Sequence, residues 1–122
     1  QWALDALQNH KPMTLFDDFY GSIIDTKCFS KALFDLIAQN QTGLINLASR
    51  DVSSKKDFIL ELAKVAGLTG QGAKTGSVSA LVPRRARALG LDVKQAEQKL
   101  GYDLPGRAEV CARLVSLWRA HA

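Results

Sequence analysis

Three arginines close together, Arg84, Arg85 and Arg87, are the side chains in this sequence that are best suited to bind a charged ligand. A guanidinium group donates several N–H bonds from a planar fork, and this geometry matches the oxygens of a phosphate or diphosphate. The cluster therefore predicts an anion site. A solvated basic turn is the alternative interpretation of the same residues.

Phe19 and Tyr20 follow two acidic residues in a segment that we interpret as a turn. An aromatic ring there can stack on a nucleoside base, or it can cover the edge of a hydrophobic core. Asp17 and Asp18 are adjacent, so on an extended backbone their side chains point to opposite faces and cannot form a facing acid and base pair. We interpret these carboxylates as turn residues rather than as substrate ligands.

The sequence contains no recognisable catalytic or metal-binding arrangement. Neither Tyr20 nor Tyr102 is followed by a lysine at the fourth position, so no helical neighbour would lower the pKa of either phenol. His10 and His121 have no carboxylate or thiol at the spacing of metal ligands, and we expect both imidazoles to be solvated. The sequence therefore predicts no catalytic residue and no metal site.

The glycine-rich run over residues 67–76 has the residue type that phosphate-binding loops need. Such loops lead from a strand into the N-terminus of a helix, because backbone N–H groups must face the phosphates. This run instead follows a helical pattern and leads into an extended one, and Ala73 separates Lys74 from Gly72. We predict a mobile surface loop over residues 69–76, and no cofactor site in this chain.

The composition is that of one soluble globular domain spanning residues 1–122, with 47% hydrophobic and 23% charged residues. No apolar run approaches the roughly 18 to 20 residues that a membrane helix needs. The net charge of +4 arises from 16 basic and 12 acidic residues spread along the chain, which is a weak footprint for a nucleic-acid binder. We expect neither a membrane nor a nucleic acid as partner.

Two cysteines bear on the cellular setting of the protein. Cys28 and Cys111 each lie on the apolar face of an expected helix. We therefore predict two buried thiols in a reducing cytoplasm rather than a disulfide framework. The N-terminus at Gln1 has no features of a signal peptide and resembles the middle of a helix, so we expect the chain to be part of a longer protein.

Hydrophobic periodicity and capping residues predict an α/β fold, with a few short strands and four or five helices. The expected helices span residues 1–9, residues 27–39, the stretch between Ser54 and Gly67, the stretch from Asp92 to Leu100, and residues 107–119. The expected extended segments span residues 13–16, 22–24, 44–48 and 77–83.

Local signals at the helix ends support these assignments. Ser54 with Asp57 fits a capping box, Gly67 is a natural helix stop, and Asp25 or Thr26 can cap the helix over residues 27–39. We expect that helix to bury the broad stripe formed by Cys28, Phe29, Ala32, Leu33, Leu36 and Ile37. We expect the last helix to turn inward Val110, Cys111, Leu114, Val115 and Trp118.

Several segments, taken in order, carry a resemblance to a known family. They are residues 11–18 (KPMTLFDD), residues 21–22 (GS), residues 43–49 (GLINLAS) and residues 84–101 (RRARALGLDVKQAEQKLG), with Leu104 and Pro105 behind them. Together they resemble the carboxyl-terminal half of dTDP-4-dehydrorhamnose reductase and other RmlD-like members of the extended short-chain dehydrogenase/reductase family. This chain has Phe19 where such reductases commonly have Gln, and Arg85-Ala86 where they have Arg-Pro.

The resemblance implies the substrate-binding part of a 4-keto-sugar-nucleotide reductase that uses NADPH or NADH in polysaccharide biosynthesis. The Rossmann half and the catalytic Tyr and Lys of such an enzyme are not encoded here, so the isolated chain is expected to be inactive. A nucleotide-diphosphate sugar is the implied ligand, and Arg85 matches the arginine of the family's Arg-Pro pair. We expect Arg84, Arg87, Phe19 and Tyr20 to contribute to the same site.

The resemblance also bears on partners. In such enzymes the helix over residues 27–39 leans on the Rossmann half, so in its absence this helix would expose apolar surface and favour a homo-oligomer. The alternative is a non-catalytic regulatory or assembly domain that keeps the reductase-like architecture.

Overall fold

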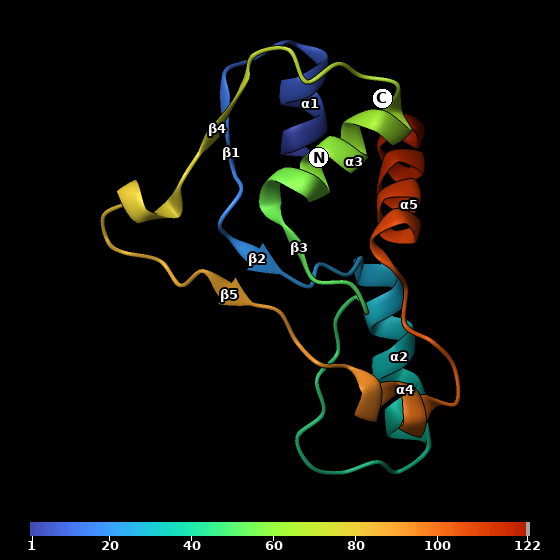
Figure 1. Cartoon of the computed structure of the whole chain (residues 1–122). Helices are drawn as coiled ribbons and strands as arrows, with labels where there is room; N and C mark the ends of the chain where they lie inside the picture. The colour runs from blue at the N-terminus through green and yellow to red at the C-terminus, as the bar shows by residue number, and fades with distance from the viewer. Residues whose placement is uncertain (122) are drawn as a thin grey trace.

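Five helices form two groups that lie at opposite ends of the molecule (Figure 1). The computed structural model describes residues 1–121. The helices are α1 (Trp2–Gln8), α2 (Thr26–Ala38), α3 (Lys55–Ala66), α4 (Lys94–Leu100) and α5 (Arg107–Ala120). All five expected helices are confirmed, with ends that differ from the prediction by one or two residues, and the α/β fold class is confirmed with them.

The helix ends follow the capping signals in the sequence. Ser54 is the N-cap of α3, and its hydroxyl accepts a hydrogen bond of 3.0 Å from the Asp57 amide. Gly67 ends α3 in the left-handed conformation, with φ of 72°, which favours glycine. Asp25 rather than Thr26 caps α2. Val93 occupies the N-cap position of α4, one residue after the expected Asp92.

Two small sheets connect the helices. In one, β1 (Met13–Phe16) pairs in parallel with β4 (Ala73–Gly76). In the other, the central strand β2 (Tyr20–Gly21) pairs antiparallel with β3 (Ser53–Ser54) and parallel with β5 (Ala88–Leu89). The second sheet therefore brings together the turn after β1, the start of α3 and the end of the arginine-rich segment.

Two expectations about the chain between α2 and residue 77 are wrong. Residues 73–76, expected in a mobile loop, form β4, because β1 supplies the hydrogen-bonding partner for a stretch that has no strand pattern of its own. Residues 44–48, expected as a strand, form none: Leu44 is 91% exposed, while Ala48 is buried in a hydrophobic cluster without strand pairing.

Two further extended segments differ from the prediction, one in position and one in backbone conformation. The strand expected over residues 22–24 lies at Tyr20–Gly21, because this pair aligns with Ser53–Ser54. The segment over residues 77–83 is not extended throughout: it begins with a short 3₁₀ turn, η1 (Val78–Ala80), in which the Ser77 hydroxyl accepts a hydrogen bond from the Ser79 amide. The position of β2 thus depends on a partner distant in sequence, whereas the 3₁₀ turn has a local hydrogen bond at its start.

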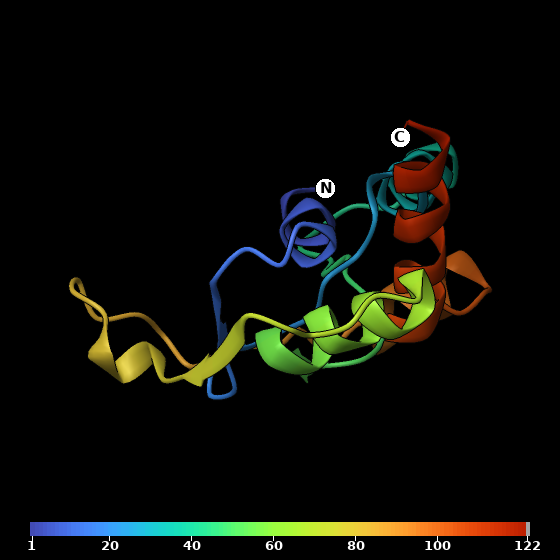
Figure 2. The same ribbon diagram turned by 90° about the horizontal axis from the view of Figure 1, so that it is seen from above.

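The upper helix group, defined as α1, α3 and α5 (Figure 1), contains two adjoining hydrophobic clusters. Viewed from above, β4 and η1 extend away from these helices (Figure 2). One cluster comprises Leu4, Phe58, Leu62, Val110, Cys111 and Val115. The other comprises Ala6, Leu7, Met13, Leu15, Ile59 and Ala63. The inward face expected for the last helix is confirmed for Val110, Cys111 and Val115, while Leu114 and Trp118 are partly buried.

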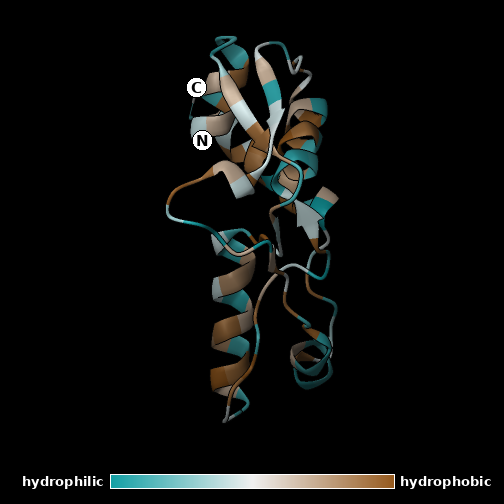
Figure 3. Ribbon diagram, turned by 60° about the vertical axis from the view of Figure 1, so that its left-hand side comes forward, coloured by the Kyte–Doolittle hydropathy of each residue, from teal (hydrophilic) through white to brown (hydrophobic). Residues whose placement is uncertain are grey.

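The lower helix group, defined as α2 and α4, has one smaller cluster. It comprises Ala32, Leu36, Ala48, Val93, Ala96, Leu100 and Leu104. The stripe expected to be buried on α2 is therefore only partly buried: Phe29, Leu33 and Ile37 are exposed, and Cys28 is half-buried. The hydropathy colouring shows apolar residues along α2 in the lower half of the molecule (Figure 3).

Asp25 joins the two helix groups. One carboxylate oxygen accepts a hydrogen bond of 3.0 Å from the Cys28 amide at the start of α2, and the other lies 3.1 Å from Nε of Arg113 on α5. Burial alone would raise the pKa of Asp25, but the Cys28 amide and the Arg113 guanidinium outweigh it, so the pKa lies below its ordinary value.

Two further expectations concern the cysteines and membrane-spanning segments. Cys28 and Cys111 are both free thiols. The expectation of a buried thiol is confirmed for Cys111 and wrong for Cys28, which is half-buried because the lower cluster covers only one side of α2. Along residues 1–121, none of the helices combines the length and the apolar character needed to cross a bilayer.

Candidate functional site

A hollow of about 250 Å³ lies beside the arginine-rich segment. Its walls come from the end of β1, the turn after β1, the first residue of α3, and the segment from η1 onward. The lining residues are Phe16, Phe19, Lys55, Val78, Leu81 and Arg85. We call this the aromatic–basic hollow, because it combines two phenyl rings with an ammonium and a guanidinium group.

The small sheet explains why Phe19 and Lys55 meet. Tyr20 pairs with Ser54 across the sheet, and the Lys55 amide donates a hydrogen bond of 2.9 Å to the Phe19 carbonyl. This contact fixes the turn after β1 against the N-terminus of α3. The basic side chain of Lys55 therefore lines the same hollow as the Phe19 ring.

The opposite wall is held by Asp18. Its two carboxylate oxygens accept hydrogen bonds of 2.5 Å from the Ser77 hydroxyl and 2.8 Å from the Val78 amide. Nε of Arg87 lies 3.7 Å from the same carboxylate. The Ser77 hydroxyl, the Val78 amide and the Arg87 charge together hold the pKa of Asp18 below its ordinary value, against a smaller opposing effect of burial.

The hollow gathers two of the five expected site residues, Phe19 and Arg85. Arg87 points to Asp18 and donates a hydrogen bond to the Ser79 hydroxyl. Tyr20 lies in β2 with 43% of its surface exposed, outside the lining, and Arg84 is likewise exposed outside it. The structure thus divides the arginine cluster into one residue at the hollow, one in a structural ion pair and one in solvent.

Lys55 and Phe16 line the hollow but were not anticipated as site residues. The sequence places Lys55 directly after the helix-capping Ser54 and Phe16 at the end of an apolar strand. Both patterns are explained by local structure alone. Their link to Arg85 arises from pairing between β2, β3 and β5, which are far apart in sequence.

A second hollow, of about 400 Å³, adjoins the first and shares Phe19 and Lys55 with it. It lies between α1, α3 and α5, and its walls are mostly apolar. The other lining residues are Gln1, Trp2, Ala3, Gly21, Ile23, Ser53, Phe58, Ile59, Leu62 and Leu114. The two hollows therefore meet at Phe19 and Lys55.

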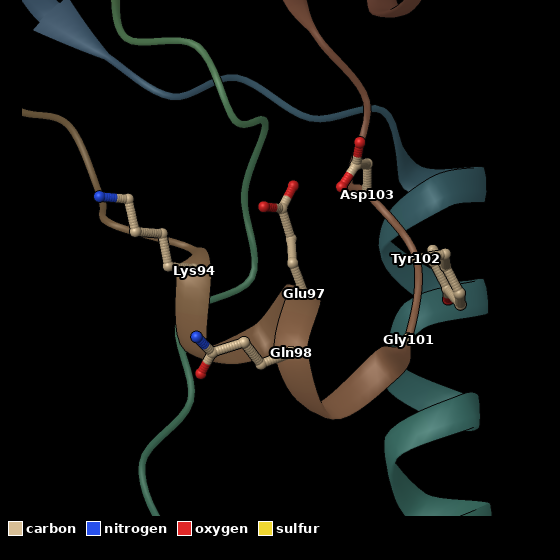
Figure 4. Close-up of a pocket in the computed structure, with 6 residues that line it drawn as sticks. All are labelled: Lys94, Glu97, Gln98, Gly101, Tyr102 and Asp103. Atoms are coloured by element: carbon tan, nitrogen blue, oxygen red, sulfur yellow. The ribbon is translucent and has the colours of Figure 1, made fainter.

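A third hollow, of about 340 Å³, lies in the lower helix group between α4 and the loop after it (Figure 4). Its acidic groups are already satisfied. Glu97 accepts a hydrogen bond of 2.8 Å from the Leu104 amide and lies 3.4 Å from Nε of Arg50, and Asp103 lies 3.0 Å from Nη1 of Arg50. These carboxylates serve as structural ion pairs, so the hollow offers no obvious acid or base.

One tyrosine and lysine do meet in space, although they are distant in sequence. Nζ of Lys31 lies 4.3 Å from the ring centroid of Tyr102, and the Tyr102 hydroxyl donates a hydrogen bond of 2.6 Å to Asp35. Burial and the Asp35 carboxylate hold the pKa of Tyr102 above its ordinary value, which is the wrong direction for an activated proton donor. We interpret the trio as a link between α2 and the loop after α4.

Within residues 1–121, the glycine-rich run does not fit a dinucleotide, and the ligating side chains do not fit a metal ion. The glycine-rich run starts at the C-terminal end of α3 and leads into β4, so the partial charge facing it is negative, and it would repel a pyrophosphate. Within the described part of the chain, no group of three or more His, Cys, Asp or Glu side chains could hold a metal ion.

Comparison with known proteins adds the wider context. No protein-family model matches the sequence, and no curated protein sequence is significantly similar to it. Solved structures, however, share its fold. The dTDP-4-dehydrorhamnose reductase from Yersinia enterocolitica matches with a TM-score of 0.79 at 16% identity, over 94% of this chain and 41% of that protein.

Two further structures extend the comparison. A dTDP-4-dehydrorhamnose reductase from Clostridium acetobutylicum matches with a TM-score of 0.81 at 12% identity, over 97% of this chain and 42% of that protein. UDP-glucuronic acid 4-epimerase from Bacillus cereus, solved with NAD, matches with a TM-score of 0.67 at 15% identity, over 93% of this chain and 35% of that protein. The resemblance to the reductases is thus confirmed as a shared fold, and the chain spans less than half the length of these proteins.

Proposed function

We propose that this chain forms the substrate-binding part of an NAD(P)H-dependent sugar-nucleotide reductase of the dTDP-4-dehydrorhamnose reductase type. The observation that carries the proposal is the aromatic–basic hollow, in which Phe19 and Arg85 line one cavity. This hollow occurs in a chain whose fold matches part of two such reductases and of a UDP-glucuronic acid 4-epimerase. The ligand is a nucleotide-diphosphate sugar.

The chemistry of the hollow suits both ends of a nucleoside diphosphate. The rings of Phe16 and Phe19 offer flat apolar faces on which a base can stack. The Arg85 guanidinium can form two parallel, charge-assisted hydrogen bonds with phosphate oxygens, and the Lys55 ammonium adds a second positive charge. Neither cation has an ion-pair partner among the described residues, so both are available to an anion.

The catalytic groups of such a reaction are proposed to lie outside this chain. The described residues provide no fitting site for a dinucleotide, and the one tyrosine with a lysine beside it has a raised pKa. NADPH or NADH would be held by a Rossmann half that belongs to the complete enzyme. Alone, this chain is expected to bind the nucleotide portion of the substrate without reducing it.

Isothermal titration of the chain with dTDP and with UDP tests the proposed site. Arg85→Ala should weaken nucleotide binding about tenfold or more, because a hydrogen bond to a charged group contributes about 1.5–3 kcal/mol. Arg84→Ala is the matched control, since it removes the same charge one residue away from the lining, and should weaken binding less than threefold, by roughly 0.5 kcal/mol. Equal affinities for both variants would contradict the assignment.

A non-catalytic regulatory or assembly domain is the alternative function. The absence of catalytic groups from the described residues is compatible with either proposal, so the coding sequence upstream of the Gln1 codon separates them. A Gly-x-x-Gly-x-x-Gly turn between a strand and a helix, followed by a Tyr-x-x-x-Lys pair, would support the enzyme. An upstream sequence without these features would favour the regulatory domain.

We further propose that the isolated chain self-associates through α2. Phe29, Leu33, Phe34 and Ile37 expose 39%, 38%, 67% and 59% of their surfaces, and they extend the apolar surface of α2 beyond Ala32 and Leu36, its residues in the lower cluster. Such a contiguous apolar face favours association. Light scattering should show a dimer or larger species that Leu33→Glu converts to monomer. A monomer mass for the unsubstituted chain at high concentration would contradict this proposal.

A further inference from the structure

The segment over residues 77–87 is an exposed loop whose two ends return to one carboxylate. The loop leaves the end of β4, passes through η1 and comes back to β5, at the outer edge of the molecule (Figure 1). We propose that Asp18 is a positioning residue that clips the base of this loop and thereby sets where Arg85 stands over the aromatic–basic hollow. This inference rests on the nucleotide site proposed above.

The first end of the loop is fixed to Asp18 by two hydrogen bonds. The Ser77 hydroxyl donates at 2.5 Å and the Val78 amide at 2.8 Å, one to each carboxylate oxygen. Val78 is 1% exposed, so its amide has no access to water as an alternative partner. The same residue supplies part of the wall of the hollow.

The second end of the loop reaches the same carboxylate through Arg87. Its Nε lies 3.7 Å from the oxygen that also accepts the Ser77 hydrogen bond, and its Nη2 donates to the Ser79 hydroxyl. The Arg87 carbonyl in turn accepts a hydrogen bond of 2.7 Å from the Tyr20 amide. Asp18 thus joins the start and the end of a segment that encloses Arg85.

The middle of the loop depends on this clip. Within residues 1–121, no hydrogen bond connects residues 82–86 to the rest of the protein, and all five are exposed. The position of Arg85 therefore follows from where the two ends are held. Phe16 at the end of β1 and Phe19 in the turn after it lie on either side of Asp18 in the sequence, so the clip holds the ends of the loop beside the two rings that line the hollow.

Asp17 provides a matched control. It carries the same charge one position earlier, its side chain is exposed, and no hydrogen bond of its carboxylate is found in the described residues. A mechanism based only on local negative charge would treat Asp17 and Asp18 alike. A clip requires Asp18 specifically.

Hydrogen exchange of the unliganded chain tests the clip independently of any nucleotide. Asp18→Ala removes all three contacts and should accelerate exchange of the Val78 amide about ten- to hundredfold, because a hydrogen bond to a charged acceptor is lost. Asp18→Asn retains an oxygen acceptor but loses the charge, so it should give an intermediate rate. Asp17→Ala should match the unsubstituted protein. Unchanged exchange at Val78 in Asp18→Ala would overturn the proposal.

Titration with dTDP tests the positioning role. Asp18→Ala should weaken dTDP binding about five- to tenfold although neither Arg85 nor Lys55 is substituted, and Asp17→Ala should not. Faster loop exchange with unchanged dTDP affinity would overturn the positioning role, provided that Arg85→Ala weakens binding in the same experiment. Absence of dTDP binding by the unsubstituted chain would instead overturn the nucleotide site itself, and the positioning role with it.

Discussion

The two helix groups differ in how completely their central helix is covered. In the upper group, α3 packs on two sides: Phe58 and Leu62 contribute to the cluster with α5, while Ile59 and Ala63 contribute to the cluster with α1 and β1. The upper group therefore covers its central helix on two sides, and it carries the aromatic–basic hollow at its edge.

In the lower group, α2 is covered on one side. Ala32 and Leu36 are buried against α4 and the chain around Ala48, while Leu33 and Phe34 face outward. The hydrophobic periodicity of α2 is as clear as that of α3. The apolar surface of α2, however, exceeds what the other elements of the lower group cover. The comparison shows that amphipathic sequence predicts a helix, whereas burial depends on which other elements are available to pack against it.

The largest expected difference between the groups concerns two leucines. Leu62→Ala removes a side chain that is 5% exposed, and it should lower the free energy of unfolding by about 2–5 kcal/mol. Leu33→Ala removes a side chain that is 38% exposed, and should change the free energy of unfolding by less than about 0.5 kcal/mol. Urea unfolding at low protein concentration measures both. Similar losses for the two variants would show that α2 is packed more fully than described.

The second-largest effect on stability is expected at Asp25, which joins the two helix groups. Asp25→Ala removes the N-cap of α2 and the partner of Arg113, and should cost about 2 kcal/mol at neutral pH. Because the pKa of Asp25 is lowered on folding, its contribution is fully present above the unfolded pKa of about 4 and is lost as pH falls through the lower, folded pKa.

The pH dependence gives a control for the same prediction. The stability difference between Asp25→Ala and the unsubstituted chain should shrink as the pH falls below about 4, where the unfolded carboxyl group becomes protonated. Urea unfolding at a series of pH values measures it. A difference that stays constant from neutral pH into this acid range would mean that packing, rather than the charge of Asp25, accounts for the loss.

A smaller effect is expected at the start of α3. Ser54→Ala removes the hydroxyl that accepts a hydrogen bond from the Asp57 amide, and should destabilise the protein by about 1 kcal/mol. Ser54→Asp restores a capping oxygen and should recover part of the loss. If both variants lose the same stability, burial of Ser54 in β3, rather than the cap, is the dominant contribution.

The last prediction concerns the rates at which the two thiols are alkylated and involves no change in stability. Burial raises the pKa of Cys111 to about 11, with a further contribution from Glu61, while Cys28 is half-buried at the start of α2. Iodoacetamide at pH 8 should therefore label Cys28 first, and should label Cys111 only after addition of urea. Simultaneous labelling in the absence of urea would show that the upper core opens readily.

Much of the fold could be predicted because its signals are local. The Ser54 cap, the Gly67 stop and the Asp25 cap are each read from a few adjacent residues, and all three mark helix ends in the structure. By contrast, β4 carries the sequence AKTG and is a strand because β1 lies beside it. A strand of two to four residues has too few side chains to show an alternating pattern, so its partner decides.

The candidate site shows the same division. Phe19 and Arg85 could be selected by residue type, because a ring and a guanidinium group fit a nucleotide wherever they lie. Tyr20, Arg84 and Arg87 share those types, but Tyr20 lies in β2, Arg87 pairs with Asp18, and Arg84 is exposed in the loop. The role of Asp18 could not be predicted, since its partners Ser77 and Val78 lie 59 and 60 positions away in the sequence.

The most direct test of the nucleotide site is a map of backbone amide shifts during titration with dTDP. Binding in the aromatic–basic hollow should give the largest changes at Phe19, Lys55, Val78 and Arg85, with the residues of α4 unaffected. Changes centred on α4 or on the hollow beside Glu97, or no changes at saturating dTDP, would contradict the central claim that the edge of the upper helix group binds the nucleotide.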